Sequence, residues 1–181
     1  MAVKTHTWIS LWFLFAAPVI LWDIGYCFMR PRSMKGGDLH WFWKPYAWYQ
    51  EVDYVYGMPA VIEGDGFPNA QALLNLIETT MNISYLYLAY IAQWPSAPLI
   101  GFGAALMTCS KTVLYWSQEL YCGYCAIGHN DFWTIFALWI VPNSLWTLIP
   151  FFIACQLGKD MAQTLNLAAK KQTKLTNGKT L

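Results

Sequence analysis

The sequence predicts an all-α integral membrane protein, a four-transmembrane-helix bundle with an intramembrane cavity and a lumenal lid between helices 1 and 2. Three observations predict this class. Of the 181 residues, 57% are hydrophobic and 18% aromatic, whereas only 12% are charged, about half the charge of a soluble domain. The net charge of +1 gives no field that would attract nucleic acid. The apolar residues also gather in segments of about 20 residues, the length that crosses a bilayer.

Four segments have this length and composition, at residues 8–29, 69–94, 99–121 and 132–157. The first has no cleavage site of small residues after its core, so we expect a retained span and not a removed signal peptide. The second is polar for a span. The third follows it after a connection that is too short for anything but a tight helical hairpin.

The remaining segments are a long insertion and a polar tail. Residues 30–68 are rich in Trp, Tyr, Gly and acidic residues, which favours a lid over one membrane face, with an amphipathic stretch around 39–55 at the interface. Residues 1–158 then form a single membrane domain. The Lys-rich residues 159–181 form a cytoplasmic tail, mostly disordered after one or two amphipathic turns. Lysines near both ends weakly favour cytoplasmic termini, so the lid and the 121–131 loop would face the lumen.

Ionisable side chains inside the expected spans mark a candidate site, because charge is expensive at membrane depth. Asp23, Glu78 and Lys111 lie in the lumenal halves of three spans, if each residue rises about 1.5 Å along its helix. Asn143 and Trp146 lie one turn apart in the fourth span at a similar depth. These matched depths predict that all four spans line one closed pocket.

Helical spacing gives two polar stripes that face this pocket. The stripes are Glu78, Asn82 and Tyr85 in the second span, and Lys111, Tyr115 and Glu119 in the third. We expect Lys111 to pair with a carboxylate, and the candidates are Glu119 and Asp23. A purely structural role stays open for Glu119 in an ion pair that holds the spans together, and for Asn82 in a hydrogen bond between helices.

Other motifs narrow the chemistry. Cys122 and Cys125 form a lone CxxC pair in the expected lumenal loop. A second pair is missing, which disfavours zinc, while an oxidising lumen permits a disulfide, and the sequence leaves open whether one forms. The sequence contains no GxGxxG, P-loop, GxSxG or HExxH motif, so we expect neither a metal nor another cofactor.

Five short segments, in this order and spacing, carry a resemblance to a known family. They are Trp43–Ala47 with Asp53 following; Ile77–Thr79; Val113–Tyr115 with Glu119 and Gly123; Gly128–His129; and Asn143–Trp146 with Pro150. On these residues the chain resembles the emopamil-binding protein family, the EXPERA-domain membrane proteins that include the sterol Δ8–Δ7 isomerase. The similarity covers most of residues 15–158 and is patchy in the lid. Val19 stands where the isomerase has a histidine, Asp23 where it has Glu, and Lys111 with Thr112 where it has Gly-Asp.

The resemblance implies a cofactor-independent enzyme of the endoplasmic reticulum membrane that protonates an alkene, passes through a carbocation and loses a proton. Because of the departures, we expect a divergent isomerase or cyclase of an alkene or polyene terpenoid or a sterol-like lipid, in specialised terpenoid metabolism. Cyclisation, double-bond isomerisation and another rearrangement stay open. The expected catalytic residues are Glu78, Asp23, Asn143 and Trp146, and the expected substrate-binding residues are Lys111, Tyr115, Glu119, Asn82, Tyr85, Trp22 and Tyr46.

The physical chemistry of these residue types agrees with such roles. A carboxyl in an apolar pocket can donate a proton, a second can accept one, and a Trp ring can stabilise a cation. Glu78 is expected to be the essential carboxyl. The expected partners are a hydrophobic substrate and membrane lipid, not nucleic acid, and the sequence leaves a monomer or a homodimer open.

Two other functions remain as alternatives. A non-catalytic protein could bind sterols or amphiphilic amines through ionised Asp23 and Glu78. A chaperone or trafficking adaptor for another membrane protein would need no small ligand at all. Binding of a small lipid and turnover of an alkene distinguish the three.

Overall fold

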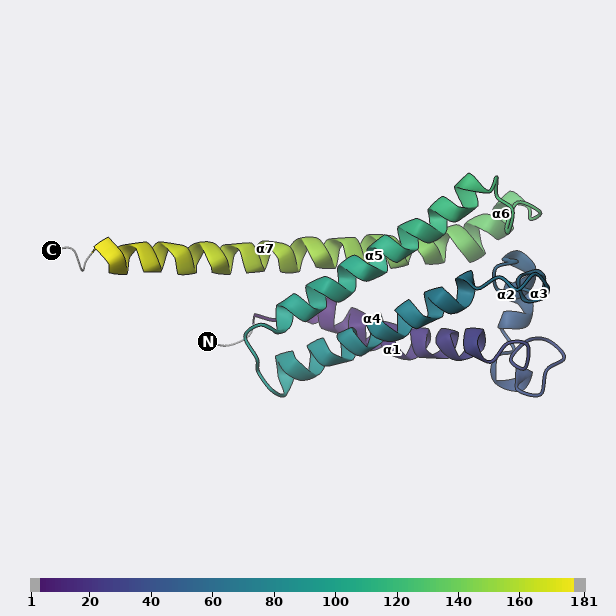
Figure 1. The fold of residues 1–181 in the computed structure, drawn as a ribbon, viewed down its shortest axis with the longest axis horizontal. Helices are drawn as coiled ribbons and strands as arrows, with labels where there is room; N and C mark the ends of the chain where they lie inside the picture. Colours follow the sequence, from purple (N-terminus) through teal and green to yellow (C-terminus); the bar gives the residue numbers. More distant parts are fainter. Residues whose placement is uncertain (1–3, 178–181) are drawn as a thin grey trace.

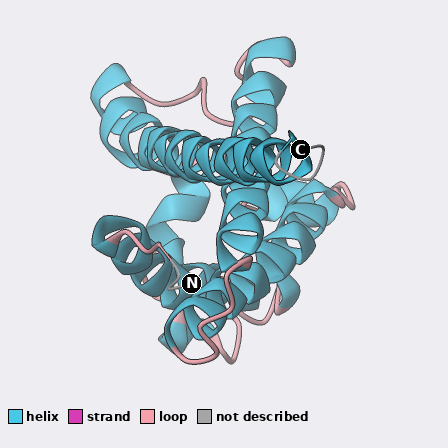
Figure 2. Cartoon of the chain, turned by 90° about the vertical axis from the view of Figure 1, so that its left-hand side faces the viewer, coloured by secondary structure: helices cyan, strands magenta, loops and turns pink. Residues whose placement is uncertain are grey.

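The computed structural model describes residues 4–177, with side chains as far as residue 173, and this part of the chain consists of helices and loops without strands (Figure 2). The long helices in it are α1 (Thr7–Phe28), α4 (Phe67–Tyr90), α5 (Ala97–Tyr121) and α7 (Val141–Asn177) (Figure 1). Helix α1 packs on α4, α4 on α5, and α5 on α7.

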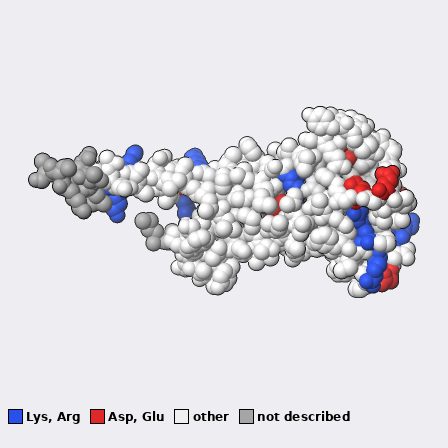
Figure 3. Space-filling model, viewed as in Figure 1, with Lys and Arg blue, Asp and Glu red and all other residues white. Residues whose placement is uncertain are grey.

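Three helical segments of the described chain are long and apolar enough to cross a membrane. They are Thr7–Phe28, Ala97–Tyr121 and Phe132–Thr173. Few charged side chains lie along the middle of the molecule in Figure 3, whereas charged groups gather at the lid end and along the far part of α7. Helix α4 is as long as its neighbours but less apolar, because its sequence includes Asn75, Glu78 and Asn82, which it buries inside the molecule.

Local sequence signals explain where these helices begin. The carboxylate of Asp65 accepts the N–H of Phe67 at 2.8 Å, directly before Pro68 in the first turn of α4. Proline is favoured there because its missing N–H has no partner within the helix. Pro98 starts α5 in the same way. The short connection before Pro98 makes α4 and α5 a tight hairpin, as the sequence predicts.

The last long helix contains a π-helical turn beside the candidate site. Helix α6 (Phe132–Ile135) leads through a π-helical turn, η2 (Phe136–Ile140), directly into α7. Pro142 has no N–H, so the regular pattern cannot continue unchanged through the preceding carbonyls. The side-chain amide of Asn143 donates to the carbonyl of Trp139 at 2.8 Å, next to the Leu138 carbonyl that Pro142 leaves without its helical donor. Such π-helical turns occur frequently at functional sites.

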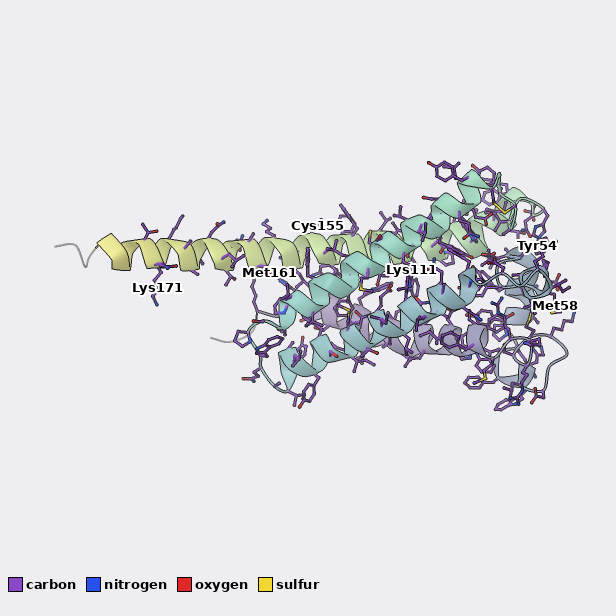
Figure 4. All side chains as sticks on the ribbon, viewed as in Figure 1. Tyr54, Met58, Lys111, Cys155, Met161 and Lys171 are labelled. Atoms are coloured by element: carbon purple, nitrogen blue, oxygen red, sulfur yellow. A yellow bond between two sulfur atoms is a disulfide. The ribbon has the colours of Figure 1, made fainter. Side chains whose placement is uncertain are left out.

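The polar tail is helical, contrary to the sequence-based expectation of disorder after one or two turns. Helix α7 continues to Asn177 and projects beyond the other helices, where Figure 4 labels Lys171. After Gly158 this stretch is rich in Ala, Gln, Leu and Lys, which are strong helix formers, and it contains no proline. Helix propensity and continuity with α7 therefore outweigh the polar composition, which favours disorder. Residues 178–181 lie outside the described chain.

The lid is made of short helical pieces at the end of the molecule opposite the α7 extension (Figure 1). They are η1 (His40–Phe42), α2 (Tyr46–Val52) and α3 (Met58–Ile62). One cluster of buried side chains joins the lid to α1, with Tyr26 stacked on Tyr46 at a centroid distance of 3.9 Å. Other lid aromatics face outward, and Trp48 is 77% exposed. An outward aromatic face agrees with the expected position at a membrane interface.

The helices are packed tightly at one end and diverge toward the lid (Figure 1). At the tight end Phe13, Tyr85 and Leu157 belong to one buried cluster drawn from α1, α4 and α7. Gly101 of α5 lies so close to this cluster that a Cβ atom there would be 2.8 Å from the ring of Tyr85. At the same end, two residues that precede α1 contact α7. Lys4 and His6 lie 2.7 and 2.5 Å from the carboxylate of Asp160. The divergence leaves space for a pocket below the lid.

Candidate active-site pocket

A pocket of about 410 Å³ lies between the lid and helices α1, α4, α5 and α7. That volume is within the usual range for sites that bind small molecules. Most of its wall is apolar or aromatic, and a few polar side chains project into it. The lining residues used below are Trp22, Asp23, Tyr46, Gln71, Asn75, Lys111, Tyr115, Asn143 and Trp146.

Asp23 contributes a carboxylate from α1 to the pocket wall. The hydroxyl of Tyr46, in the lid, donates to one oxygen, and the amide of Asn75, in α4, donates to the other at 3.3 Å. Burial raises the pKa of the Tyr46 hydroxyl well above its ordinary value, so this hydroxyl stays protonated and remains a donor. Asp23 therefore links the lid to the bundle at the edge of the pocket.

Lys111 pairs with Glu78, and the expected partners Glu119 and Asp23 are both wrong. Its ammonium lies 3.1 Å from a carboxylate oxygen of Glu78 and also donates to the side-chain oxygen of Asn75. Figure 4 shows Lys111 between α5 and α4. The neighbouring helix is closer than Glu119, which lies eight residues further along α5, about 12 Å away along the axis. Lys111 is thus held by two residues of α4.

Glu78 lies behind the main pocket and is not part of its lining. Besides Lys111, it accepts a hydrogen bond from the hydroxyl of Thr108 at 2.9 Å. It lines a second, very small cavity of about 10 Å³, together with Asn82 and Trp146. Trp146 and Ile20 line both cavities, and Glu78 reaches the main pocket only through its contact with Lys111.

Helix α7 contributes two polar residues to the wall of the pocket. Asn143 and Trp146 both line it. The ring of Trp146 packs edge-on against Trp12 of α1, with centroids 5.2 Å apart. Since the amide of Asn143 is used by the carbonyl of Trp139, its side-chain oxygen is the part available to a ligand.

The other sequence-predicted residues divide into two groups. Trp22, Tyr46 and Tyr115 line the pocket, and the Tyr115 hydroxyl is bonded to a lid residue. Tyr85 lies in the buried cluster at the far end, packed against Phe13. Glu119 lines a different pocket on the outer side of α5.

Sequence reasoning missed the polar residues that organise the pocket. Asn75 and Gln71 lie three and seven residues before Glu78, so they extend the same polar stripe of α4 toward the lid. The stripe could have been followed upstream from Glu78. The other residue is Asp53, which the resemblance includes without a role; it is a fully buried lid acid that accepts hydrogen bonds from Tyr115 and from the indole of Trp139, the latter at 3.1 Å. No helical periodicity marks a loop residue of this kind.

Burial raises the pKa of Asp53 to about 6, despite the hydrogen bonds from Tyr115, from the Val55 amide and from Trp139. The charge of Glu119 acts in the same direction as burial. Asp53 therefore fastens the lid to α5 and η2 through a group that changes protonation near neutral pH.

The CxxC pair, left open by the sequence, is a disulfide between Cys122 and Cys125. It is the yellow bond near α6 in Figure 4. The disulfide belongs to the turn between α5 and α6, at the same end as the lid. Because both sulfurs are bonded to each other, they are not available to hold a metal with the adjacent Glu119.

The site is defined by its own geometry, without a template. Comparisons with family models, with curated proteins and with solved structures find no match to this chain.

Proposed function

We propose that the protein is an intramembrane acid–base isomerase or cyclase that acts on an alkene-bearing terpenoid or sterol-like lipid, in the manner of the emopamil-binding protein family that its motifs resemble. The observation that carries the proposal is the placement of Asp23. Its carboxyl borders an apolar pocket that is also lined by Asn143 and Trp146, while the only lysine of the pocket is engaged by Glu78.

In this proposal α4 crosses the membrane together with the three apolar segments. Its 24 residues span about 36 Å at 1.5 Å per residue, which is enough for a bilayer core. Its polar residues Asn75, Glu78 and Asn82 are buried between the other helices, so they would not meet lipid. The resulting four-span bundle places the pocket within the membrane of the endoplasmic reticulum, where an apolar substrate can enter from the lipid.

We assign the proton transfers to Asp23 in place of Glu78. Glu78 is held by Lys111 and Thr108 and does not line the pocket, so it serves as a positioning residue for Lys111. A protonated Asp23 carboxyl adds its proton to one carbon of the alkene. The cation faces the ring of Trp146, and the Asp23 carboxylate then takes a proton from a neighbouring carbon. Substrate and product are isomers, and the carboxyl ends in its starting state.

Deuterium incorporation tests this proposal whichever isomer is the product. Full-length protein in lipid nanodiscs is incubated in D₂O with a panel of polyene terpenoids and sterols with a ring double bond, and the recovered lipids are analysed by mass spectrometry. Reversible protonation of an alkene leaves deuterium in substrate or product. Asp23→Asn should lower the rate by about 10²–10⁴-fold, the usual effect of removing a general acid.

A matched variant separates the two carboxyls. Glu78→Gln should retain much more activity than Asp23→Asn, because Gln can still accept from Thr108 and from Lys111. The opposite order would return the acid role to Glu78. Absence of deuterium from every lipid of the panel, with the protein folded, would reject alkene protonation of these classes.

A second function is favoured by one specific observation. Asp23 accepts hydrogen bonds from both Tyr46 and Asn75, an arrangement that suits an ionised carboxylate. An ionised Asp23 in an apolar pocket would bind an amphiphilic amine without turnover. In that case a long-chain amine binds in an Asp23-dependent manner and no lipid acquires deuterium.

A further inference from the structure

A second pocket, of about 780 Å³, lies on the outer side of the molecule between α5 and the α6–η2–α7 segment. It is named the outer groove here. Its wall is formed mainly by apolar and aromatic side chains, which include Trp116, Leu120, Tyr124, Trp139 and Leu148. Leu120, Tyr124 and Leu148 are more than half exposed, so the groove is open to the surroundings of α5 and α7.

The outer groove is separate from the pocket that holds Asp23. Trp139 lies between them, since it lines the groove and packs against Tyr115, a lining residue of the first pocket, with ring centroids 5.9 Å apart. Trp116 packs edge-on against Trp139 with centroids 4.6 Å apart. The two pockets have no lining residue in common. A ligand in the groove would therefore contact none of the residues assigned to proton transfer.

Glu119 is the only charged residue in this groove, and it is only 2% exposed. One carboxylate oxygen accepts the backbone N–H of Ala126 at 3.2 Å, in the turn that the Cys122–Cys125 disulfide closes. The backbone N–H of Ile127 also faces this carboxylate, while the other oxygen is buried and has no partner within hydrogen-bond distance among the described residues. No lysine or arginine of the described chain forms an ion pair with it either.

An unpartnered buried carboxylate oxygen is costly, so a partner for it is expected. The hydroxyls of Ser117 and Thr147, which also line the groove, already donate to the carbonyls of Val113 and Asn143, at 2.8 Å each. Ser144 and Tyr124 also line the groove, but neither hydroxyl is a hydrogen-bond partner of the buried Glu119 oxygen, which has none among the described residues. A ligand in the groove can supply the missing donor.

We propose that the outer groove binds a neutral lipid alcohol, a molecule with a long apolar body and one hydroxyl that donates to Glu119. The apolar wall accepts the body, and a hydroxyl brings one donor to the one free acceptor. A protonated amine would bring three donors, whereas Glu119 offers a single unpartnered oxygen. An acyl tail alone would fill the groove but leave Glu119 unpaired.

Photolabelling in nanodiscs tests the groove with two matched probes. The probes are hexadecanol with a diazirine in mid-chain and its methyl ether, which keeps the oxygen but cannot donate. Labelled peptides are quantified by mass spectrometry and normalised to labelling of exposed residues of α1, such as Leu14, which corrects for partitioning into the bilayer. We expect the alcohol to label the groove about tenfold more than the ether, as one hydrogen bond to a carboxylate would allow.

Two leucines of α7 provide a matched pair of variants. Leu148 lines the groove and is 53% exposed, whereas Leu145, one turn earlier, is 45% exposed and lines none of the three pockets described here. Leu148→Trp should fill the groove and remove most of the alcohol labelling, and Leu145→Trp should leave it unchanged. Equal labelling by alcohol and ether, or alcohol labelling that survives Leu148→Trp, would overturn the proposal. These measurements need no turnover, so they stand apart from the proposed reaction.

Discussion

The depth of a polar residue along its helix predicts whether it lies near the pocket, but not which residue it pairs with. The sequence predicts that five residues at matched depths line one pocket. Four of them do, Asp23, Lys111, Asn143 and Trp146, whereas Glu78 does not. Depth along a helix follows from counting residues, since each adds about 1.5 Å. The rotation of each helix about its own axis cannot be obtained by counting residues, and this rotation determines that Lys111 contacts Glu78 of α4. The pairing could therefore not be predicted, although the presence of a carboxylate partner could.

Asp53 predicts a pH dependence of lid closure. Its pKa is about 6 with the lid in place and returns toward 3.8 when the lid lifts. The closed state therefore binds more protons between these values, so closure is strongest below about pH 4 and weakens as the pH rises to about 6. The difference between a pKa of 3.8 and one of about 6 corresponds to about 3 kcal/mol in the free energy of lid closure. Hydrogen–deuterium exchange of residues 46–62, corrected for intrinsic rates, should rise accordingly between pH 4 and 7.

The matched variants for this prediction distinguish Asp53 from its neighbour. Asp53→Asn should remove the part of the pH dependence that comes from Asp53, because the amide does not titrate. Glu119→Gln removes the other nearby acid and should retain most of the dependence. Corrected exchange that stays flat in the parent protein would contradict the assignment.

At the scale of helices, the sequence predicts positions well and extents less well. The expected spans at 8–29, 69–94 and 99–121 differ from α1, α4 and α5 by a few residues at most ends. These boundaries are marked by prolines and by the limits of apolar segments. The fourth helix continues far beyond residue 157, because nothing after it ends a helix. Hydropathy reports where a helix can be in lipid, and it does not report where a helix ends.

The close contact of α5 with α4 and α7 predicts that Gly101 is intolerant of a side chain. In Gly101→Ala the new Cβ would lie 2.8 Å from the buried ring of Tyr85 and 3.1 Å from Leu157. Overpacking of this kind costs about 1–3 kcal/mol, so the melting temperature in detergent should fall. Gly103→Ala is the control, because its Cβ meets only the flexible end of Met81 at 3.1 Å. That variant should be neutral or slightly stabilised, since alanine favours a helix by up to about 1 kcal/mol.

For the molecule as a whole, the disulfide adds information about orientation that the sequence provides only weakly. Cys122–Cys125 lies at the lid end, and disulfides persist in oxidising compartments. The lysines of the α7 extension lie at the opposite end (Figure 3), which agrees with the tendency of basic residues to remain in the cytoplasm. Both features favour a lumenal lid and a cytoplasmic α7 extension.

We therefore expect a cysteine introduced by Thr173→Cys to react with a membrane-impermeant maleimide in intact microsomes. Cys122 and Cys125 should react only after detergent and a reductant have been added. The exposed Cys155 is replaced by Ser in all samples to lower the background. A tail cysteine that is protected until detergent is added would reverse the orientation.

The contacts of Lys4 and His6 with Asp160 have a consequence for how the protein is made. The ribosome releases the start of α1 first and residue 160 only after all the other long helices have left it. The N-terminal segment is synthesised first but forms its contacts with Asp160 last. Until then, the N-terminal end of α1 lacks these contacts while the other long helices are inserted. A nascent chain stalled before residue 160 should already contain the pocket residues of α1, α4, α5 and α7, yet lack this final fastening.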